Sequence, residues 1–141
     1  MSEEQAQQLM QQMQMLETYF TDLSQRETTL LSVLREAMSA IESIKSLRQK
    51  PNSDTLVPIG MGTYVQTKIS SNDKIVLNIG AGIAVEKTHD SAMNYLEARI
   101  KEIEIALQDT SAKKQEAMAR LEQSKDQMNQ LMQETSQNIS G

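Results

Sequence analysis

The chain has 141 residues, of which 38% are hydrophobic and only 3% are aromatic. Large aromatic and aliphatic side chains normally fill a globular core, so this composition is poor material for one. Asp and Glu outnumber Lys and Arg by 19 to 14, which gives a net charge of -5. A phosphate backbone would be repelled by that charge, so nucleic acid is not expected as a partner.

The sequence carries no sign of export or of a membrane span. Its first residues, MSEEQAQQ, have neither the basic region nor the apolar run of a signal peptide. No stretch approaches the ~20 apolar residues that cross a bilayer. There is no Cys, which excludes disulfides and thiol chemistry. We therefore expect one soluble folding unit, 1–141, that lies in the cytoplasm and has no membrane partner.

The first third of the chain repeats apolar residues in alternating steps of four and three. A straight helix drifts away from a strict 3.5-residue repeat, so a series sustained over nearly six heptads is typical of a coiled coil. Pro51 and the turn residues after it end the series, which predicts a helix over residues 1–50. The positions of this seam are Leu9, Met13, Leu16, Phe20, Leu23, Glu27, Leu30, Leu34, Ala37, Ile41, Ile44 and Arg48.

The last third of the chain has the same periodicity and predicts a second coiled-coil helix over residues 89–139. Thr88 or Asp90 is the expected N-cap, since either side chain can accept a hydrogen bond from an unpaired backbone N–H. The positions of the second seam are Met93, Leu96, Ile100, Ile103, Leu107, Thr110, Lys114, Ala117, Leu121, Ser124, Met128, Leu131 and Thr135.

The two predicted helices have nearly equal lengths, about 45 and 50 residues, or roughly 65 to 75 Å at 1.5 Å per residue. Matched lengths predict that they pair antiparallel within one chain. Two helices of a globular bundle are the alternative interpretation. Such a bundle needs further apolar helices to cover it, and the sequence predicts none.

Residues 55–87 differ from both helices in period and composition. TLVPIG, TYVQTKIS, KIVLNIG and GIAVEKT are short, rich in Val, Ile and Thr, and bounded by turn residues, which predicts four strands. Gly60-Met61-Gly62 and Gly80-Ala81-Gly82 are the expected hairpin turns, because glycine tolerates positive φ. The predicted fold class is mostly α with a small β insert: a long antiparallel coiled-coil hairpin whose helices are joined by two β-hairpins.

Two hairpins alone are marginal in water, because few strands share one small apolar face. Exposed apolar faces and unpaired edges favour pairing with another chain. We therefore expect residues 55–87 to be an assembly module; the alternative is that they only cap the coiled coil of a monomer. The residues expected in subunit assembly are Val57, Ile59, Val65, Ile69, Ile75, Leu77, Ile79, Ile83 and Val85.

The block LVPIGMGTYVQTKISSNDKIVLNIGAGIAVEKT, with a long helix on each side, resembles the alpha class of the prefoldin family over the whole chain. The block is the most specific part, since the beta class has one hairpin there. The resemblance implies a hexamer of two alpha and four beta subunits whose strands form an oligomeric β-barrel. It also implies an ATP-independent holding chaperone, not an enzyme, that captures unfolded client proteins and delivers them to a group II chaperonin. The full alpha pattern without Cys is closest to an archaeal subunit.

An antiparallel hairpin brings residues 1–20 and 122–141 together at the end farthest from the strands, which we call the tip. Several methionines of the tip fall outside the seams, so the tip has more apolar surface than its own coil can bury. Methionine adapts to many apolar surfaces, and we expect the tip to bind clients; the alternative is loose packing of ordinary helix formers. The residues expected in client binding are Leu9, Met10, Met13, Met15, Leu16, Met128, Leu131, Met132 and Ile139.

No catalytic, cofactor or metal site is expected. His89, the only histidine, stands at a helix start and is interpreted as a solvated turn residue. The two G-x-G stretches lack the later glycine and the following helix of a dinucleotide site, and there is no Walker-type motif.

Two other functions stay open on the sequence. A dimeric coiled-coil co-chaperone such as a nucleotide exchange factor also joins long helices to β structure, although its β domain follows the helices. A structural adaptor would have no client-holding activity and would not need a methionine-rich open end.

Overall fold

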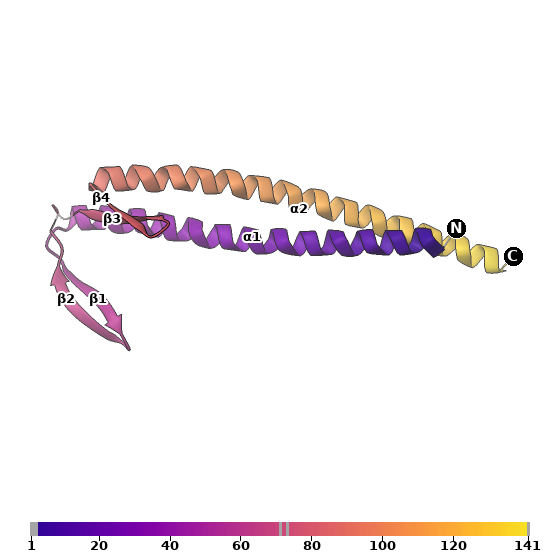
Figure 1. Cartoon of the computed structure of the whole chain (residues 1–141), viewed down its shortest axis with the longest axis horizontal. Helices are drawn as coiled ribbons and strands as arrows, with labels where there is room; N and C mark the ends of the chain where they lie inside the picture. The colour runs from indigo at the N-terminus through magenta and orange to yellow at the C-terminus, as the bar shows by residue number, and fades with distance from the viewer. Residues whose placement is uncertain (1–2, 71, 73, 141) are drawn as a thin grey trace. The chain divides into compact units, whose positions relative to one another are not determined.

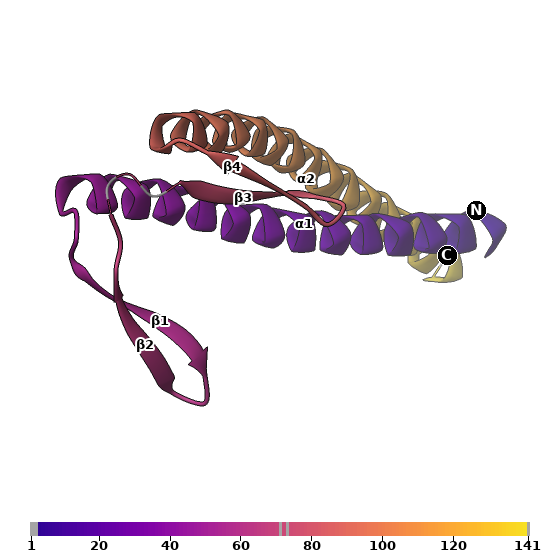
Figure 2. The same cartoon turned by 60° about the vertical axis from the view of Figure 1, so that its left-hand side comes forward.

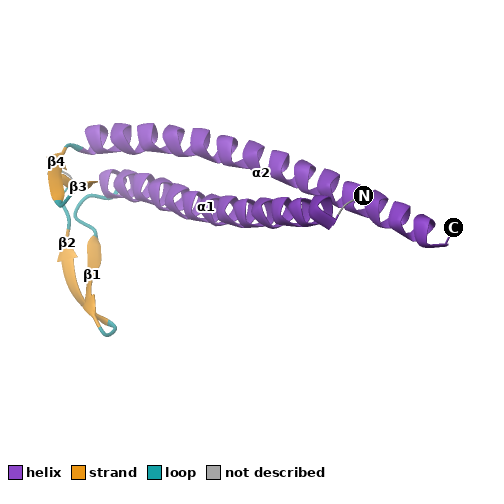
Figure 3. Cartoon of the chain, turned by 45° about the vertical axis from the view of Figure 1, so that its right-hand side comes forward, coloured by secondary structure: helices purple, strands orange, loops and turns teal. Residues whose placement is uncertain are grey.

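The computed structural model describes residues 3–70, 72 and 74–140, and the side chains among these up to residue 137. Two long helices enclose two antiparallel β-hairpins in the sequence, which confirms the predicted fold class (Figure 1, Figure 3). The elements are α1 (Glu3–Gln49), β1 (Asp54–Gly60), β2 (Thr63–Lys68), β3 (Ile75–Gly80), β4 (Ile83–Lys87) and α2 (His89–Ser140).

The contacts within the chain divide it into two units. The first, Met1–Ser32 with Glu104–Gly141, holds the N-terminal part of α1 and the C-terminal part of α2. The second, Val33–Ile103, holds the rest of both helices and the four strands. Within the first unit the two helix segments lie side by side and run in opposite directions (Figure 1).

The predicted seam is the buried face of the helices in the first unit. Leu9 and Leu23 of α1 and Ala117 and Leu121 of α2 are each less than one tenth exposed. Thr110 is 1% exposed, and its hydroxyl donates a 2.8 Å hydrogen bond to the carbonyl of Ala106. A polar residue is therefore tolerated at the seam because its only buried donor is satisfied.

Two of the three charged positions of the predicted seams, Glu27 and Lys114, meet each other in the first unit. Lys114 Nζ lies 3.2 Å from Glu27 Oε1, and the two side chains are 22% and 31% exposed. The same ammonium lies 5.1 Å from the centre of the Phe20 ring, within the range of a cation–π interaction. Partly buried charges stabilise a structure only when they are paired, so this pair favours one register of α1 against α2, as polar seam residues do in other coiled coils.

In the second unit the seam residues Ala37 and Ile44 of α1 and Ile103 of α2 are buried, and so is Ala92, which stands next to the seam position Met93. At the end of the seam of α1, Arg48 is exposed. Its guanidinium instead donates a 2.5 Å hydrogen bond to the carboxylate of Asp90.

The start of α2 settles which residue is its N-cap. Thr88 Oγ1 accepts a 3.2 Å hydrogen bond from the N–H of Ser91, as an N-cap does. Asp90, the other candidate, forms an ion pair with Arg48 instead.

The interpretation of His89 as a solvated turn residue is wrong. His89 is the first residue of α2, and it is only 8% exposed. His89 is buried because it stands four residues before Met93, so it occupies the next position of the α2 seam toward the N-terminus.

Each hairpin turns through two residues, as the glycines predict. Met61 and Gly62 have φ of 50° and 73°, and Ala81 and Gly82 have φ of 54° and 74°. Positive φ at both central residues is the requirement of a type I′ turn, whose twist matches that of the strands.

The two hairpins differ in how much of their surface the chain itself covers. In the second unit β3–β4 lies beside the helices (Figure 2). Leu77 and Ile79 border a depression together with Ala37 of α1 and Leu96 of α2. Lys87 of β4 also lies over the ring of Tyr95 on α2, 5.7 Å from its centre. All of β1–β2 is exposed except Thr55, which is half-buried.

Replacing Glu27 with Leu leaves Lys114 partly buried without its partner. We expect a loss of about 1 to 2 kcal/mol in the free energy of unfolding, between the values for exposed and fully buried pairs. Urea unfolding followed by far-UV circular dichroism measures it. The reversed pair, E27K with K114E, should recover most of the loss.

Glu104→Leu is the matched control, because Glu104 is exposed and makes no ion pair with any residue that the structure describes. If E27L and E104L change the unfolding free energy equally, the pair has no part in holding the helices together.

Candidate functional site

The residues expected at the tip separate into two sets by exposure. Leu9 is 8% exposed, and the other seam residues of the set are half-buried, namely Met13, Leu16, Met128 and Leu131. The off-seam residues Met10, Met15 and Met132 are 54%, 73% and 63% exposed. Ile139 lies in α2, and its side chain is outside the described part. The apolar surface that the coil cannot bury is therefore the off-seam set.

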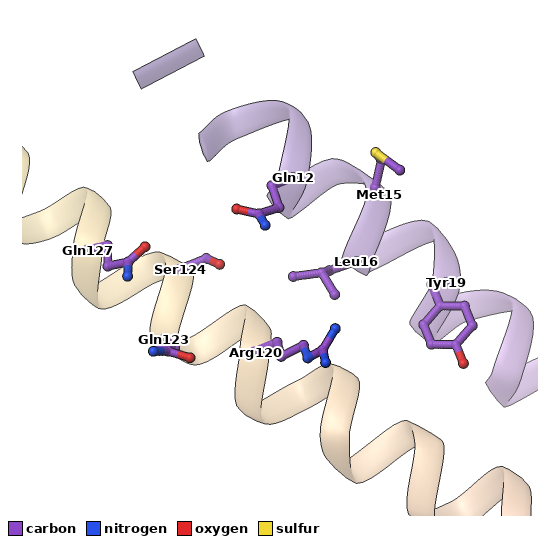
Figure 4. Close-up of a pocket in the computed structure, with 8 residues that line it drawn as sticks. All are labelled: Gln12, Met15, Leu16, Tyr19, Arg120, Gln123, Ser124 and Gln127. Carbon is purple, nitrogen blue, oxygen red and sulfur yellow. The ribbon is translucent and has the colours of Figure 1, made fainter. Parts of the chain in front are cut away.

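A shallow groove bordered by Met15 runs between the helices. Leu16 points from α1 toward α2, whereas Met15 points away from α2 (Figure 4). Amides supply much of the wall, from Gln12 on α1 and from Gln123 and Gln127 on α2. A second groove nearer the chain ends is also lined mostly by glutamine, around Leu9 and Leu131. Amide side chains can donate and accept hydrogen bonds without adding a charge.

Sequence reasoning missed Tyr19, which is 45% exposed and borders two grooves together with Met15. It stands four residues after Met15, so both lie on one face of α1. The signal that could have found it is the spacing of these two apolar residues, since neither belongs to the seam.

The residues expected in subunit assembly also differ in exposure. On β1–β2, Val57 and Val65 are cross-strand partners and are 43% and 49% exposed. Ile59 on the same face is 66% exposed. Ile69 follows β2 and is half-buried, and its carbonyl accepts a 2.9 Å hydrogen bond from the N–H of Asn52.

On β3–β4 the expected assembly residues lie on the face that borders the helices of the second unit. Ile79 and Ile83 are 46% and 54% exposed, while Ile75, Leu77 and Val85 are half-buried. Leu77 and Val85 are cross-strand partners. This face is therefore partly covered by the chain's own helices, whereas β1–β2 is exposed throughout except at Thr55.

Among the described residues, no group of three His, Cys, Asp or Glu side chains is placed to hold a metal ion. In the described part of the chain, neither helix has an apolar stretch long enough to cross a membrane.

A family model described as Prefoldin subunit matches residues 9–139. The chain belongs to the prefoldin family. A prefoldin subunit alpha from the archaeon Nitrosopumilus maritimus is 76% identical over 133 residues, which cover 94% of this chain and 92% of that protein. A prefoldin subunit alpha from Methanospirillum hungatei is 32% identical and covers 79% of this chain and 85% of its own length. The predicted likeness to an archaeal prefoldin alpha subunit is confirmed.

Solved structures show the same fold at low sequence identity. A chain of filamentous PFD from Methanocaldococcus jannaschii, solved by cryo-electron microscopy, has a TM-score of 0.68 and 22% identity; the match covers 79% of this chain and 93% of that one. The prefoldin beta subunit from Thermococcus strain KS-1 has a TM-score of 0.61 and 17% identity, covering 90% of this chain and 91% of its own.

Family membership and the alpha-subunit relatives identify the chain as a prefoldin-type chaperone subunit. Prefoldin is a chaperone family and not a family of enzymes. The exposed apolar surfaces of this chain include the off-seam methionines of the tip and the β1–β2 hairpin.

Proposed function

We propose that the chain is the alpha subunit of a hexamer of two alpha and four beta prefoldin subunits. The hexamer holds non-native proteins at its coiled-coil tips without ATP and delivers them to a group II chaperonin in the cytoplasm. The observation that carries the proposal is the exposure of Met10, Met15 and Met132 at the tip. Residues 1–141 act in it as one unit, with helices on either side of an assembly module.

Assembly through the strands is supported by the state of β1–β2. Its apolar side chains are 43% to 66% exposed, on both faces of the hairpin: Leu56, Val57, Ile59, Tyr64 and Val65. Full burial of such a side chain contributes about 1.5 to 3 kcal/mol. Partner strands that cover this hairpin would gain that contribution, and a closed barrel would remove its edges.

Client holding is supported by the chemistry of the tip. Methionine side chains are flexible and polarizable, so they adapt to unrelated apolar surfaces. The glutamines around them offer hydrogen bonds to an extended backbone. Such a surface recognises exposed apolar chain of many sequences, which is the property that a holding chaperone needs. Delivery to a chaperonin rests on membership of the family alone.

Replacing Met10 and Met15 together with Ser tests the tip in the reconstituted complex. We expect the protection of a diluted, denatured client against aggregation to fall several-fold, because apolar contact area is lost. Light scattering over time measures it. The matched control is Met38→Ser with Met118→Ser, since these methionines lie outside the tip, one on α1 and one on α2, and are also exposed, 55% and 44%. Equal protection by all three complexes would contradict client holding at the tip.

Replacing Val65 with Lys tests the strand surface. A charge on this face opposes its burial against partner strands, and we expect the hexamer to dissociate into smaller species in native mass spectrometry. Gln66→Lys is the control, because Gln66 lies on the opposite face of the same strand and pairs with Leu56. Assembly would not use the Val57–Val65 face if V65K left the hexamer intact.

A further inference from the structure

We propose that the alpha-subunit tip selects client segments in which an apolar side chain is followed closely by a lysine or arginine. Met15 and Tyr19 take the apolar side chain, and Asp22 pairs with the basic one. The proposal rests on the client-holding function proposed above and adds the class of segment that is held.

The three residues lie in line on one face of α1. Steps of four and three, from Met15 to Tyr19 and from Tyr19 to Asp22, follow the helix surface. Together with Gln11, Gln14 and Thr18, these side chains border a single shallow groove. Met15 points away from α2 (Figure 4), so this face is open to a partner from outside.

The tip is predominantly negatively charged. Residues 3–25 contain four carboxylates and no basic side chain; the first is Arg26. Residues 116–137 of α2 carry four carboxylates and two basic side chains, Arg120 and Lys125. These two segments therefore have charges of -4 and -2, against -5 for the whole chain.

Of the carboxylates in residues 3–25, Asp22 is the one that borders the groove. Glu3 and Glu4 stand in the first turn of α1, where they stabilise the helix through its dipole. Glu27 is paired with Lys114. Asp22 makes no ion pair with any residue the structure describes. Glu17 also makes no ion pair with any residue the structure describes, but it is not part of the groove lining.

A cation of the chain itself also lies near the groove. Arg120 borders the neighbouring groove with Met15 and Tyr19, and its guanidinium lies 2.9 Å from the carboxylate of Glu116. Arg120 is thus already compensated from its own helix.

Charge complementarity selects the occupant. A second copy of this tip would bring the same negative charge, and so would a nucleic acid. A basic side chain of an unfolded protein can pair with Asp22, and the ring of Tyr19 adds a face on which such a cation binds. The apolar residue before it then reaches Met15 and Tyr19.

The test measures binding of three labelled peptides to the complex assembled with this chain. They share one apolar core, which is followed by lysines, glutamines or glutamates. At low salt we expect the lysine peptide to bind about three- to ten-fold more tightly than the glutamate peptide. One exposed ion pair, together with the negative electrostatic potential of the tip, gives a difference of about this size. The ratio should shrink as salt is added, because the Debye length falls. Fluorescence anisotropy gives each Kd.

Asp22→Asn in the alpha chain should reduce this ratio at least two-fold and leave the glutamine peptide unchanged. Glu104→Gln is the control, since Glu104 is exposed on α2 but lies outside both segments. Met15→Ser should weaken all three peptides alike. A photo-crosslinking group on the apolar core should attach to residues 11–22 of α1, which separates this site from the tips of other subunits.

The outcomes distinguish the two proposals. If all three peptides bind equally, or if D22N keeps the full ratio, the selection proposed here is wrong although client holding stands. If none of the peptides binds and M15S protects clients as well as the native chain does, the proposed function itself fails.

Discussion

The narrow apolar stripe on each helix is the constraint on which the rest of the structure depends. With one Phe, three Tyr and no Trp, the chain has no material for a third layer of side chains. The stripes must therefore cover each other, and they do so partly with small residues such as Ala37, Ala92 and Ala117. In the first unit the other faces of both helices stay in contact with solvent. Large apolar residues off the stripe in the first unit are exposed for that reason, as Met10, Met15, Tyr19 and Met132 are.

A stripe of this kind specifies that the helices pair but only weakly specifies their register, since one heptad looks much like the next. The pair of Glu27 and Lys114 supplies a distinction that the apolar residues lack. A shift of α1 by one heptad would separate the two charges while both remain partly buried, which is costly. Register in turn decides which glutamines of α2 face the methionines of α1.

The two hairpins of the β insert differ in what covers them: one lies partly against the chain's own helices and the other is exposed to solvent. The apolar face of β3–β4 is partly covered within the second unit, so this hairpin combines the role of a cap with the role expected of an assembly element. β1–β2 has no such cover. The sequence left two interpretations open, capping and assembly. Capping fits β3–β4, which lies partly against the helices, whereas β1–β2 has no such cover and fits assembly better. This difference makes β1–β2 the surface on which the proposed assembly depends most.

The sequence by itself determined the helices, their buried faces and the four strands, because each depends on a periodicity or on a residue type that is local in the chain. Leu9 and Leu121 were assigned to the seam by spacing alone, and the turns at Gly62 and Gly82 by the need for positive φ. Only the tertiary structure decided that Lys114 meets Glu27 and that Thr88, not Asp90, caps α2. It also decided that His89 is buried and that one face of β3–β4 is partly covered while β1–β2 is open. These features depend on which distant residues are brought together when two helices and two hairpins pack, and no local pattern carries that information.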